Sequence, residues 1–279
     1  MTGSIDRQRE ALGARLRELR LTAGLSGAEL ARRNGWHQTK ISKLEYGRIK
    51  PSREDIRMWC AQCSALDQVP DLVASLENLT TAYLEWRKVL GTGTKRRQHA
   101  LVNLSETAEI IRVYNPHFVP GFLQTAGYAA EVLRNVSRFY QTPDDVEAGV
   151  AKRLERQQLL YRGNRRFHFL VGEQALYTTV GGAAVMNGQL DRLIAVTGLP
   201  RVTIGVVPTK AELPFAPTNF SMFDTKVVLV EAITAELTIT QPREVKIYHQ
   251  AFDTLARQSV TGEEARDLIR KALDTRRVE

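Results

Sequence analysis

The sequence has little cysteine and no long apolar run, and both shortages restrict what the protein can be. Only two cysteines, Cys60 and Cys63, occur among 279 residues, too few for a disulfide-stapled scaffold of this length. Their C-x-x-C spacing could supply half of a metal site, but no second Cys or His pair has matching spacing. We therefore interpret both as buried structural cysteines.

No apolar stretch approaches the ~20 residues that a membrane-spanning helix needs. The N-terminal decapeptide MTGSIDRQRE also lacks the apolar segment of a signal peptide. From these two absences we expect a cytoplasmic protein with no membrane partner.

Motifs that carry catalysis are missing as well. The sequence contains neither a G-x-x-x-x-G-K-[ST] phosphate loop nor a G-x-S-x-G nucleophile elbow. Its 5 histidines are scattered, without the spacing of a metal site. Glu173 and Glu231 follow strand-like segments, where ligand-contacting carboxylates often lie, but no base or nucleophile accompanies them. We expect no enzyme activity, no catalytic residue, no metal and no cofactor.

What the chain does have is a basic surplus near its start. The 39 lysines and arginines exceed the 31 acidic residues by 8. Between Met1 and Ser64 the sequence has 13 basic and 7 acidic residues, so most of the surplus lies there. A basic region alone is often only a solvated surface, but beside a DNA-binding motif it indicates phosphate binding.

Such a motif occupies residues 26–48, which read as two short helices joined by a tight turn. Ser26 is a good N-cap, and Glu29 three residues later completes a capping box. Asn34 and Gly35 mark the turn, because both tolerate a left-handed backbone. The first helix is therefore expected to end at this turn.

The second helix follows directly. Ile41 and Leu44 form its buried stripe, and Gly47 ends it. Polar and basic side chains occupy the opposite face. Two helices in this order predict a helix-turn-helix, whose second helix lies in the major groove of DNA.

This stretch resembles the lambda/434 repressor-like, or xenobiotic-response-element, class of helix-turn-helix regulators. The residues that carry the resemblance are the motif core, Ala31, Gly35, Ile41 and Leu44, and the run Ser42-Lys43-Leu44-Glu45. Asn34 departs from the class, which usually has an aliphatic residue there, and Trp36 is bulky where a small or polar residue is common. The resemblance implies an all-α, five-helix N-terminal domain.

The same resemblance implies which side chains meet DNA. The positions that read base edges in this class are occupied by Gln38, Thr39 and Lys43. Glutamine can pair bidentately with adenine, and lysine can donate to guanine. We expect phosphate contacts, which position the protein without reading sequence, from His37, Lys40, Arg48, Lys50 and Arg53. Further along, Lys95, Arg96 and Arg97 either touch flanking DNA or lie in a solvated linker.

The length of the chain predicts about two domains. We place the helix-turn-helix domain at residues 1–75, a connecting helix or linker at 76–100, and an α+β regulatory or dimerisation domain at 101–279. A helix over 66–90 should begin in the first domain and continue into the connecting segment, and a second helical pattern covers 100–114. Short strands are expected over 166–171, 202–207, 220–223, 227–231 and 237–240. The fold class is therefore α+β, with a small sheet in the C-terminal domain.

The stretch from Ser105 to Leu273 resembles a C-terminal domain of unknown function that follows a helix-turn-helix in WhiJ-like regulators of filamentous actinobacteria. The matching residues include Tyr83 with Trp86-Arg87, Ile111-Arg112, the run 119–125 (VPGFLQT), Arg153 with Arg156-Gln157, Val180-Gly181-Gly182, and Pro242 with Tyr248 and Phe252. The resemblance implies a developmental transcription regulator, often encoded beside a small BldB-like partner protein.

Two functions follow. In the first, the protein is a sequence-specific repressor that binds double-stranded DNA at an inverted repeat as a homodimer and is modulated through its C-terminal domain by an unknown effector. In the second, it is an antitoxin-like protein that captures a small neighbour-encoded partner, and its DNA binding serves autoregulation. Both share the DNA-binding step and differ in what the C-terminal domain senses.

Overall fold

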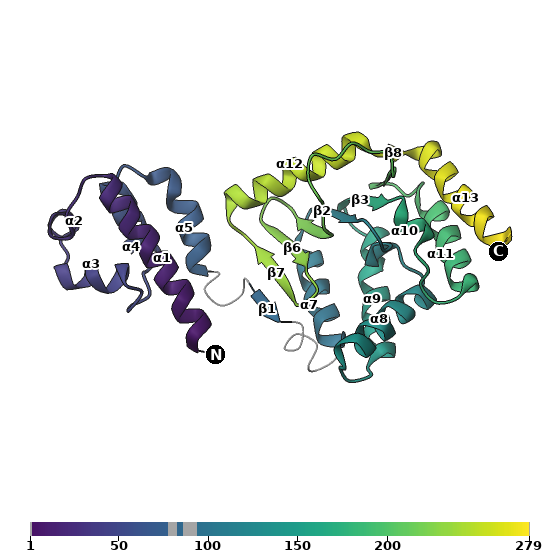
Figure 1. Cartoon of the computed structure of the whole chain (residues 1–279), viewed down its shortest axis with the longest axis horizontal. Coiled ribbons are helices and arrows are strands. Elements are labelled where there is room, and N and C mark those ends of the chain that lie inside the picture. Colours follow the sequence, from purple (N-terminus) through teal and green to yellow (C-terminus); the bar gives the residue numbers. More distant parts are fainter. Residues whose placement is uncertain (1, 78–82, 86–93, 279) are drawn as a thin grey trace. The chain divides into compact units, whose positions relative to one another are not determined.

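The structure is a computed structural model that describes residues 2–77, 83–85 and 94–278 (Figure 1). The chain forms two compact units. Unit 1 comprises residues 1–82 and 239–245, and unit 2 comprises residues 83–238 and 246–279. The expected fold class is confirmed, because a helical N-terminal region precedes a region that mixes sheet and helices. The domain division at 1–75, 76–100 and 101–279 stays a prediction.

Unit 1 is built from short helices that bury one apolar face each. Its elements are α1 (Thr2–Thr22), α2 (Gly27–Asn34), α3 (Gln38–Glu45), α4 (Arg53–Gln62), the 3-10 helix η1 (Leu66–Gln68) and α5 (Val69–Glu77). Ser52 and Asp55 form a capping box at the start of α4. The core joins α1, α2, α3, α4 and α5 around Leu16, Ile41, Ile56 and Leu72.

Trp59 and the two cysteines lie inside this core. The indole Nε1 of Trp59 donates to the backbone oxygen of Leu16 at 2.9 Å, so a polar atom in the core is satisfied by α1. Cys60 and Cys63 are both buried. Burial raises the pKa of the Cys60 thiol to about 11. The thiol is therefore protonated near neutral pH, as expected of a structural cysteine.

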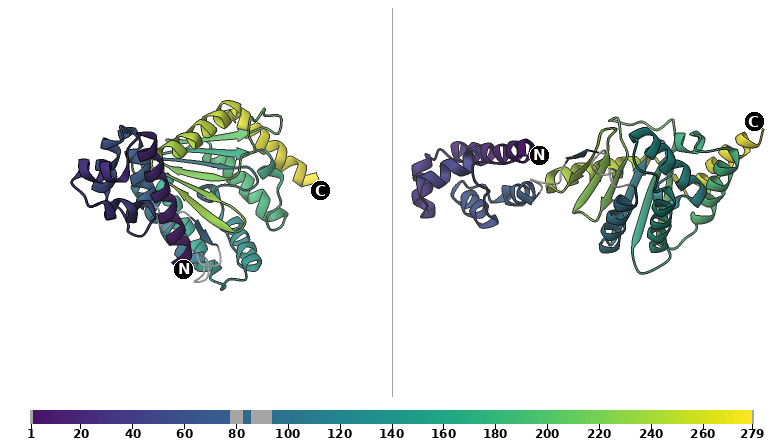
Figure 2. Two further views of the ribbon diagram at one scale, coloured as in Figure 1. Left: turned by 60° about the vertical axis from the view of Figure 1, so that its left-hand side comes forward. Right: turned by 90° about the horizontal axis from the view of Figure 1, so that it is seen from below.

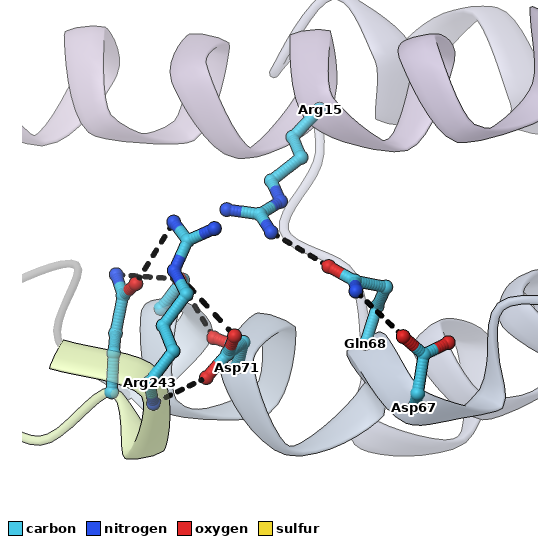
Figure 3. Close-up of polar contacts among 7 residues, drawn as sticks. Arg15, Asp67, Gln68, Asp71 and Arg243 are labelled. Carbon is cyan, nitrogen blue, oxygen red and sulfur yellow. Dashed lines mark hydrogen bonds and ion pairs between the residues drawn. The ribbon is translucent and has the colours of Figure 1, made fainter. Parts of the chain in front are cut away.

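A segment from near the end of the chain completes unit 1. Residues 239–245 carry the start of α12 (Pro242–Gln258), and they pack on α5 (Figure 3). Arg243 bonds to Asp71 through its backbone N at 3.4 Å and through Nε at 3.5 Å. Gln241 donates to Ser75 at 3.0 Å. The rest of α12, from Lys246 onward, belongs to unit 2.

Unit 2 is organised around one sheet of 8 described strands, in the order β1-β7-β6-β5-β2-β3-β4-β8 (Figure 2). The strands β2, β3 and β4 are parallel to each other, and the pairs β1–β7, β2–β5, β5–β6 and β4–β8 are antiparallel. Their bounds are β1 (Tyr83–Glu85), β2 (Ile110–Asn115), β3 (Arg166–Gly172), β4 (Val202–Val207), β5 (Phe220–Phe223), β6 (Val227–Glu231), β7 (Ala235–Ile239) and β8 (Val260–Thr261).

Helices cover both faces of the sheet. The helices of unit 2 besides α12 are α7 (Thr94–Thr107), η3 (Gly121–Leu123), α8 (Ala126–Tyr140), α9 (Val146–Gln157), η4 (Gln158–Leu160), α10 (Gln174–Tyr177), α11 (Ala183–Val196) and α13 (Gly262–Val278). No helix among the described residues is long and apolar enough to cross a membrane.

The alternation of side chains along β3 separates these two faces. Phe167 and Phe169 point to the larger core, where they meet Phe122 of η3 at ring distances of 5.3 and 5.8 Å. His168 points the other way and meets Phe252 of α12 at 5.0 Å. We call these the main-core face and the α12 face.

Two expected helices are wrong in part. The helix expected over 100–114 begins at Thr94 and ends at Thr107, and residues 110–115 form β2, because the β-branched run Ile110-Ile111-Arg112-Val113 pairs in parallel register with β3. The helix expected over 66–90 ends at Glu77 in the described chain, and Tyr83–Glu85 is a strand paired with β7. Trp86 and Arg87, which belong to the C-terminal resemblance, lie outside the described residues.

Candidate nucleic-acid interface

The turn between α2 and α3 has the backbone geometry that the sequence predicts. The Ser26 hydroxyl accepts from the Glu29 backbone N at 3.1 Å and caps α2. Gly35 has φ of 64°, in the left-handed region, and its N–H bonds back to α2. The Glu29 carboxylate accepts from Arg32 and Arg33. Its role in the predicted capping box is therefore replaced by two surface ion pairs.

The α3 helix divides into a buried and an exposed face. Ile41 and Leu44 are buried in the core of unit 1. The three residues predicted to read bases are all exposed: Gln38, Thr39 and Lys43. The structure thus brings these three side chains together on the outward surface of one eight-residue helix. Their contact with bases stays a prediction.

Most of the residues predicted to contact phosphate surround this face. His37 is the N-cap residue of α3, makes no side-chain cap bond and is exposed. Arg48 and Lys50 are exposed in the loop before α4, and Arg53 is exposed at the first position of α4. These side chains therefore flank both ends of α3 in sequence, where phosphate contacts would fix the register of the helix on DNA.

Lys40 has a different environment from the other predicted phosphate contacts. Its Nζ lies 2.6 Å from Asp55 Oδ1 and 4.1 Å from the centre of the Trp36 ring. Burial opposes ionisation of Asp55, but hydrogen bonds from Lys40 and Ser52 lower its pKa below the ordinary value. Lys40 therefore ties α3 to the capped start of α4, and Trp36, a departure from the class, supplies part of its site.

A buried ion pair that the sequence reading missed holds the other end of α3. Arg20 Nε lies 2.6 Å from Glu45 Oε1, and the two side chains are 9% and 7% exposed. A second bond joins Arg20 Nη2 to Glu45 Oε2 at 3.1 Å, and Nη1 donates to the backbone oxygen of Leu25. The sequence contains one indication of this pair. Arg20 continues the apolar Leu12-Leu16 stripe of α1, and an arginine on a buried stripe is expected to have an acidic partner.

The backbones of α1 and α3 also come unusually close. A Cβ added to Gly13 would lie 2.4 Å from the oxygen of Leu44 and 2.5 Å from that of Glu45. Only glycine permits this approach, since real Cβ contacts are longer than 3.0 Å. The end of α3 is therefore positioned by direct backbone packing as well as by the Arg20–Glu45 pair.

Asn34, the other departure from the class, is buried at the end of α2. Neither its Oδ1 nor its Nδ2 has a hydrogen-bond partner among the described residues. Leaving such groups unsatisfied costs about 1–3 kcal/mol. We expect Asn34→Leu to raise the free energy of unfolding by about 1–2 kcal/mol, measured by urea denaturation. The isosteric Asn34→Asp should lower it, because it buries a charge; equal stability of the two variants would contradict this reading.

The basic run Lys95-Arg96-Arg97 is divided between the surface and the interior of unit 2. Lys95 and Arg96 are exposed on α7. Arg97 bonds to Glu231 and, at 2.6 Å, to Glu236. Arg97 therefore joins α7 to the strands of unit 2, and it lies in a helix where a linker was one of the two alternatives. Glu231, singled out as a candidate ligand-contacting carboxylate, is one of its partners.

Two motifs of the C-terminal resemblance contact each other in the structure: the run 119–125, and Arg153 with Arg156-Gln157. Gln157 Nε2 donates to the backbone oxygens of Gly121 and Gln124 at 2.9 and 2.8 Å. Arg153 Nη1 donates to Gln124 Oε1 at 2.5 Å, and the Arg156 guanidinium lies 4.6 Å from the Phe122 ring centre. Burial, followed by the charge of Arg153, lowers the pKa of Arg156 to about 9. These α9 side chains thus support the 119–125 loop from inside the protein.

Models of known protein families match two separate regions of the chain. A family model described as a domain of unknown function (DUF5753) matches residues 98–271, more than half of the chain. The chain belongs to this family. A second model, described as a helix-turn-helix domain, matches residues 11–76. A helix-turn-helix beside the DUF5753 domain suggests a DNA-binding protein with a regulatory role.

Other similarities are weak. No curated protein matches the chain. The structure is similar to NucT from Helicobacter pylori over 64% of this chain and 96% of that chain, with 12% sequence identity and a TM-score of 0.32. A similarity this weak carries no argument about the fold or the function of this DUF5753 protein.

Proposed function

We propose that the protein is a sequence-specific transcriptional repressor, non-catalytic, that binds an inverted-repeat operator as a homodimer. The observation that carries the proposal is the division of α3. Gln38, Thr39 and Lys43 are exposed together, while Ile41 and Leu44 fix the opposite face in the core. A helix held in this way can present the same three side chains to a major groove at every encounter.

The dimer belongs to the proposal because one half-site gives too little contact for tight binding. Two copies would place their α3 helices about 34 Å apart, one turn of DNA, or a multiple of it. Unit 2 would modulate this assembly through an effector or a small protein partner. Operators with half-sites moved by about 5 base pairs should lose binding, because the second helix then faces the wrong side of the duplex.

Base reading by Gln38 is tested with the protein's own promoter region. We expect Gln38→Ala to lower discrimination between the operator and a single-base variant by about 1–3 kcal/mol at one base pair, measured by fluorescence anisotropy at fixed salt. Arg48→Ala should weaken binding to both sequences alike and reduce the salt dependence. The matched control is Gln250→Ala, which removes an exposed glutamine from α12 in unit 2. If Gln38→Ala discriminates as well as the control, Gln38 does not read a base.

A further inference from the structure

A hollow lies on the α12 face of the sheet, at the amino ends of the parallel strands β2, β3 and β4. Its volume is about 330 Å³, within the range of small-molecule sites. The residues that line it include Arg112, Arg166, His168, Arg201 and Thr203. It lies in unit 2, outside the helix-turn-helix, and no part of the proposed DNA contact uses it.

The strand register explains why these side chains converge. Arg112 is paired with His168, and His168 with Thr203, so the three form a row across neighbouring strands. Arg166 lies two residues before His168 and shares its face of the sheet. The backbone oxygen of Arg201 accepts from Phe167 N at 2.8 Å, which places Arg201 beside the start of β3. Three arginines thus surround one hollow.

In the part of the chain that the structure describes, these arginines are not ion-paired. Among the described residues, no carboxylate lies within 4.0 Å of Arg112, Arg166 or Arg201, whereas other arginines of unit 2, such as Arg266 and Arg270, are ion-paired. Outside the described ranges the sequence contains a single acidic residue, Glu279. A guanidinium cannot lose its proton near neutral pH, so three positive charges line the hollow, and the Asp253 carboxylate of α12, which acts with Arg112 on His168, offsets part of them.

Two further observations point to a ligand. Arg201 has φ of 64°, in the left-handed region that asparagine and glycine adopt at lower cost. A strained backbone at this position is accounted for if the arginine side chain itself is needed. The buried Nε2 of His168 has no hydrogen-bond partner among the described residues. A buried ring nitrogen without a partner therefore lies in the same row as Arg112.

We propose that this hollow binds a small molecule through a phosphate group. Guanidinium groups donate paired N–H bonds that match the oxygens of a phosphate. The exposed Thr203 hydroxyl adds a group that can donate to a remaining oxygen. The volume suits a ligand of nucleotide size.

The test measures ligand binding by the full chain in the absence of DNA, so it is independent of the proposed repressor function. Isothermal titration calorimetry would use inorganic phosphate, adenosine 5′-monophosphate and, as the ligand without phosphate, adenosine, all at constant ionic strength. We expect saturable one-to-one binding of the two phosphate-bearing probes and none of adenosine. Arg112→Gln, Arg166→Gln and Arg201→Asn should each weaken binding about tenfold or more.

The variants are chosen so that folding cannot account for the result. Arg201→Asn removes the charge and retains a residue that tolerates the left-handed backbone, and Arg166 is exposed. Arg138→Gln is the matched control, because Arg138 is exposed on α8, which packs on the main-core face. Far-ultraviolet circular dichroism and the melting temperature without ligand would establish that each variant is folded.

Three results would overturn the proposal. The first is the absence of saturable binding by the unsubstituted chain. The second is equal binding of adenosine and its monophosphate, and the third is unchanged affinity in the folded Arg166→Gln and Arg201→Asn variants. If these substitutions instead weaken binding of random duplex DNA and leave the small probes unaffected, the hollow is part of a DNA-binding surface and the proposal is wrong.

Discussion

Glu45→Ala is expected to lower the free energy of unfolding of unit 1 by about 3–5 kcal/mol. The substitution leaves the buried Arg20 guanidinium with the backbone oxygen of Leu25 as its remaining described acceptor. Removing one member of a buried ion pair costs this much because the other charge stays desolvated. Urea denaturation followed by tryptophan fluorescence, to which Trp36 and Trp59 of unit 1 contribute, would measure the change.

Two further variants separate the buried charge from other effects. Glu29→Ala is the matched control, since Glu29 also pairs with arginines but its partners are on the surface, where ion pairs contribute little. It should leave the unfolding midpoint nearly unchanged. The double variant Arg20→Met/Glu45→Leu should recover most of the lost stability, because an apolar pair of similar volume needs no charge compensation. A Glu45→Ala protein as stable as Glu29→Ala would show that the pair does not anchor α3.

Local features of the candidate interface could be predicted from the sequence, and features that join distant segments could not. The Ser26 cap, the Gly35 turn and the Ile41–Leu44 stripe depend on residues within four positions of each other, and all three occur as expected. The partners of Lys40 and Arg20 are 15 and 25 residues away. Nothing in local spacing selects Asp55 for Lys40 from the other acidic residues.

The same distinction applies to the fold. Residues 100–114 have apolar residues at helical spacing, which predicts a helix that continues through Ile110 and Ile111. A short apolar run such as this one fits the period of a strand as well as that of a helix. Pairing with β3, more than 50 residues later in the sequence, decides that this run is a strand. The assignment of residues 239–245 to unit 1 is likewise a long-range result, since Arg243 meets Asp71 across 172 positions.

Gly13→Ala is expected to destabilise unit 1 by about 2–4 kcal/mol, although alanine is the better helix former. The added methyl would overlap the backbone oxygens of Leu44 and Glu45, and backbone atoms cannot move aside as a flexible side chain can. Either α1 or the end of α3 must then shift. The shift would also loosen the Arg20–Glu45 pair, so operator affinity should fall with stability.

Gly188→Ala distinguishes this crowding from the general effect of replacing a helical glycine. Gly188 lies inside α11, and a Cβ there would meet nothing within 4 Å. That variant should be stabilised by up to about 1 kcal/mol through helix propensity, measured by thermal denaturation with circular dichroism. Opposite signs for the two substitutions would establish that close backbone packing of α1 on α3 fixes the DNA-facing helix. If Gly13→Ala also stabilises the protein and binds the operator normally, α3 is held by its side chains alone.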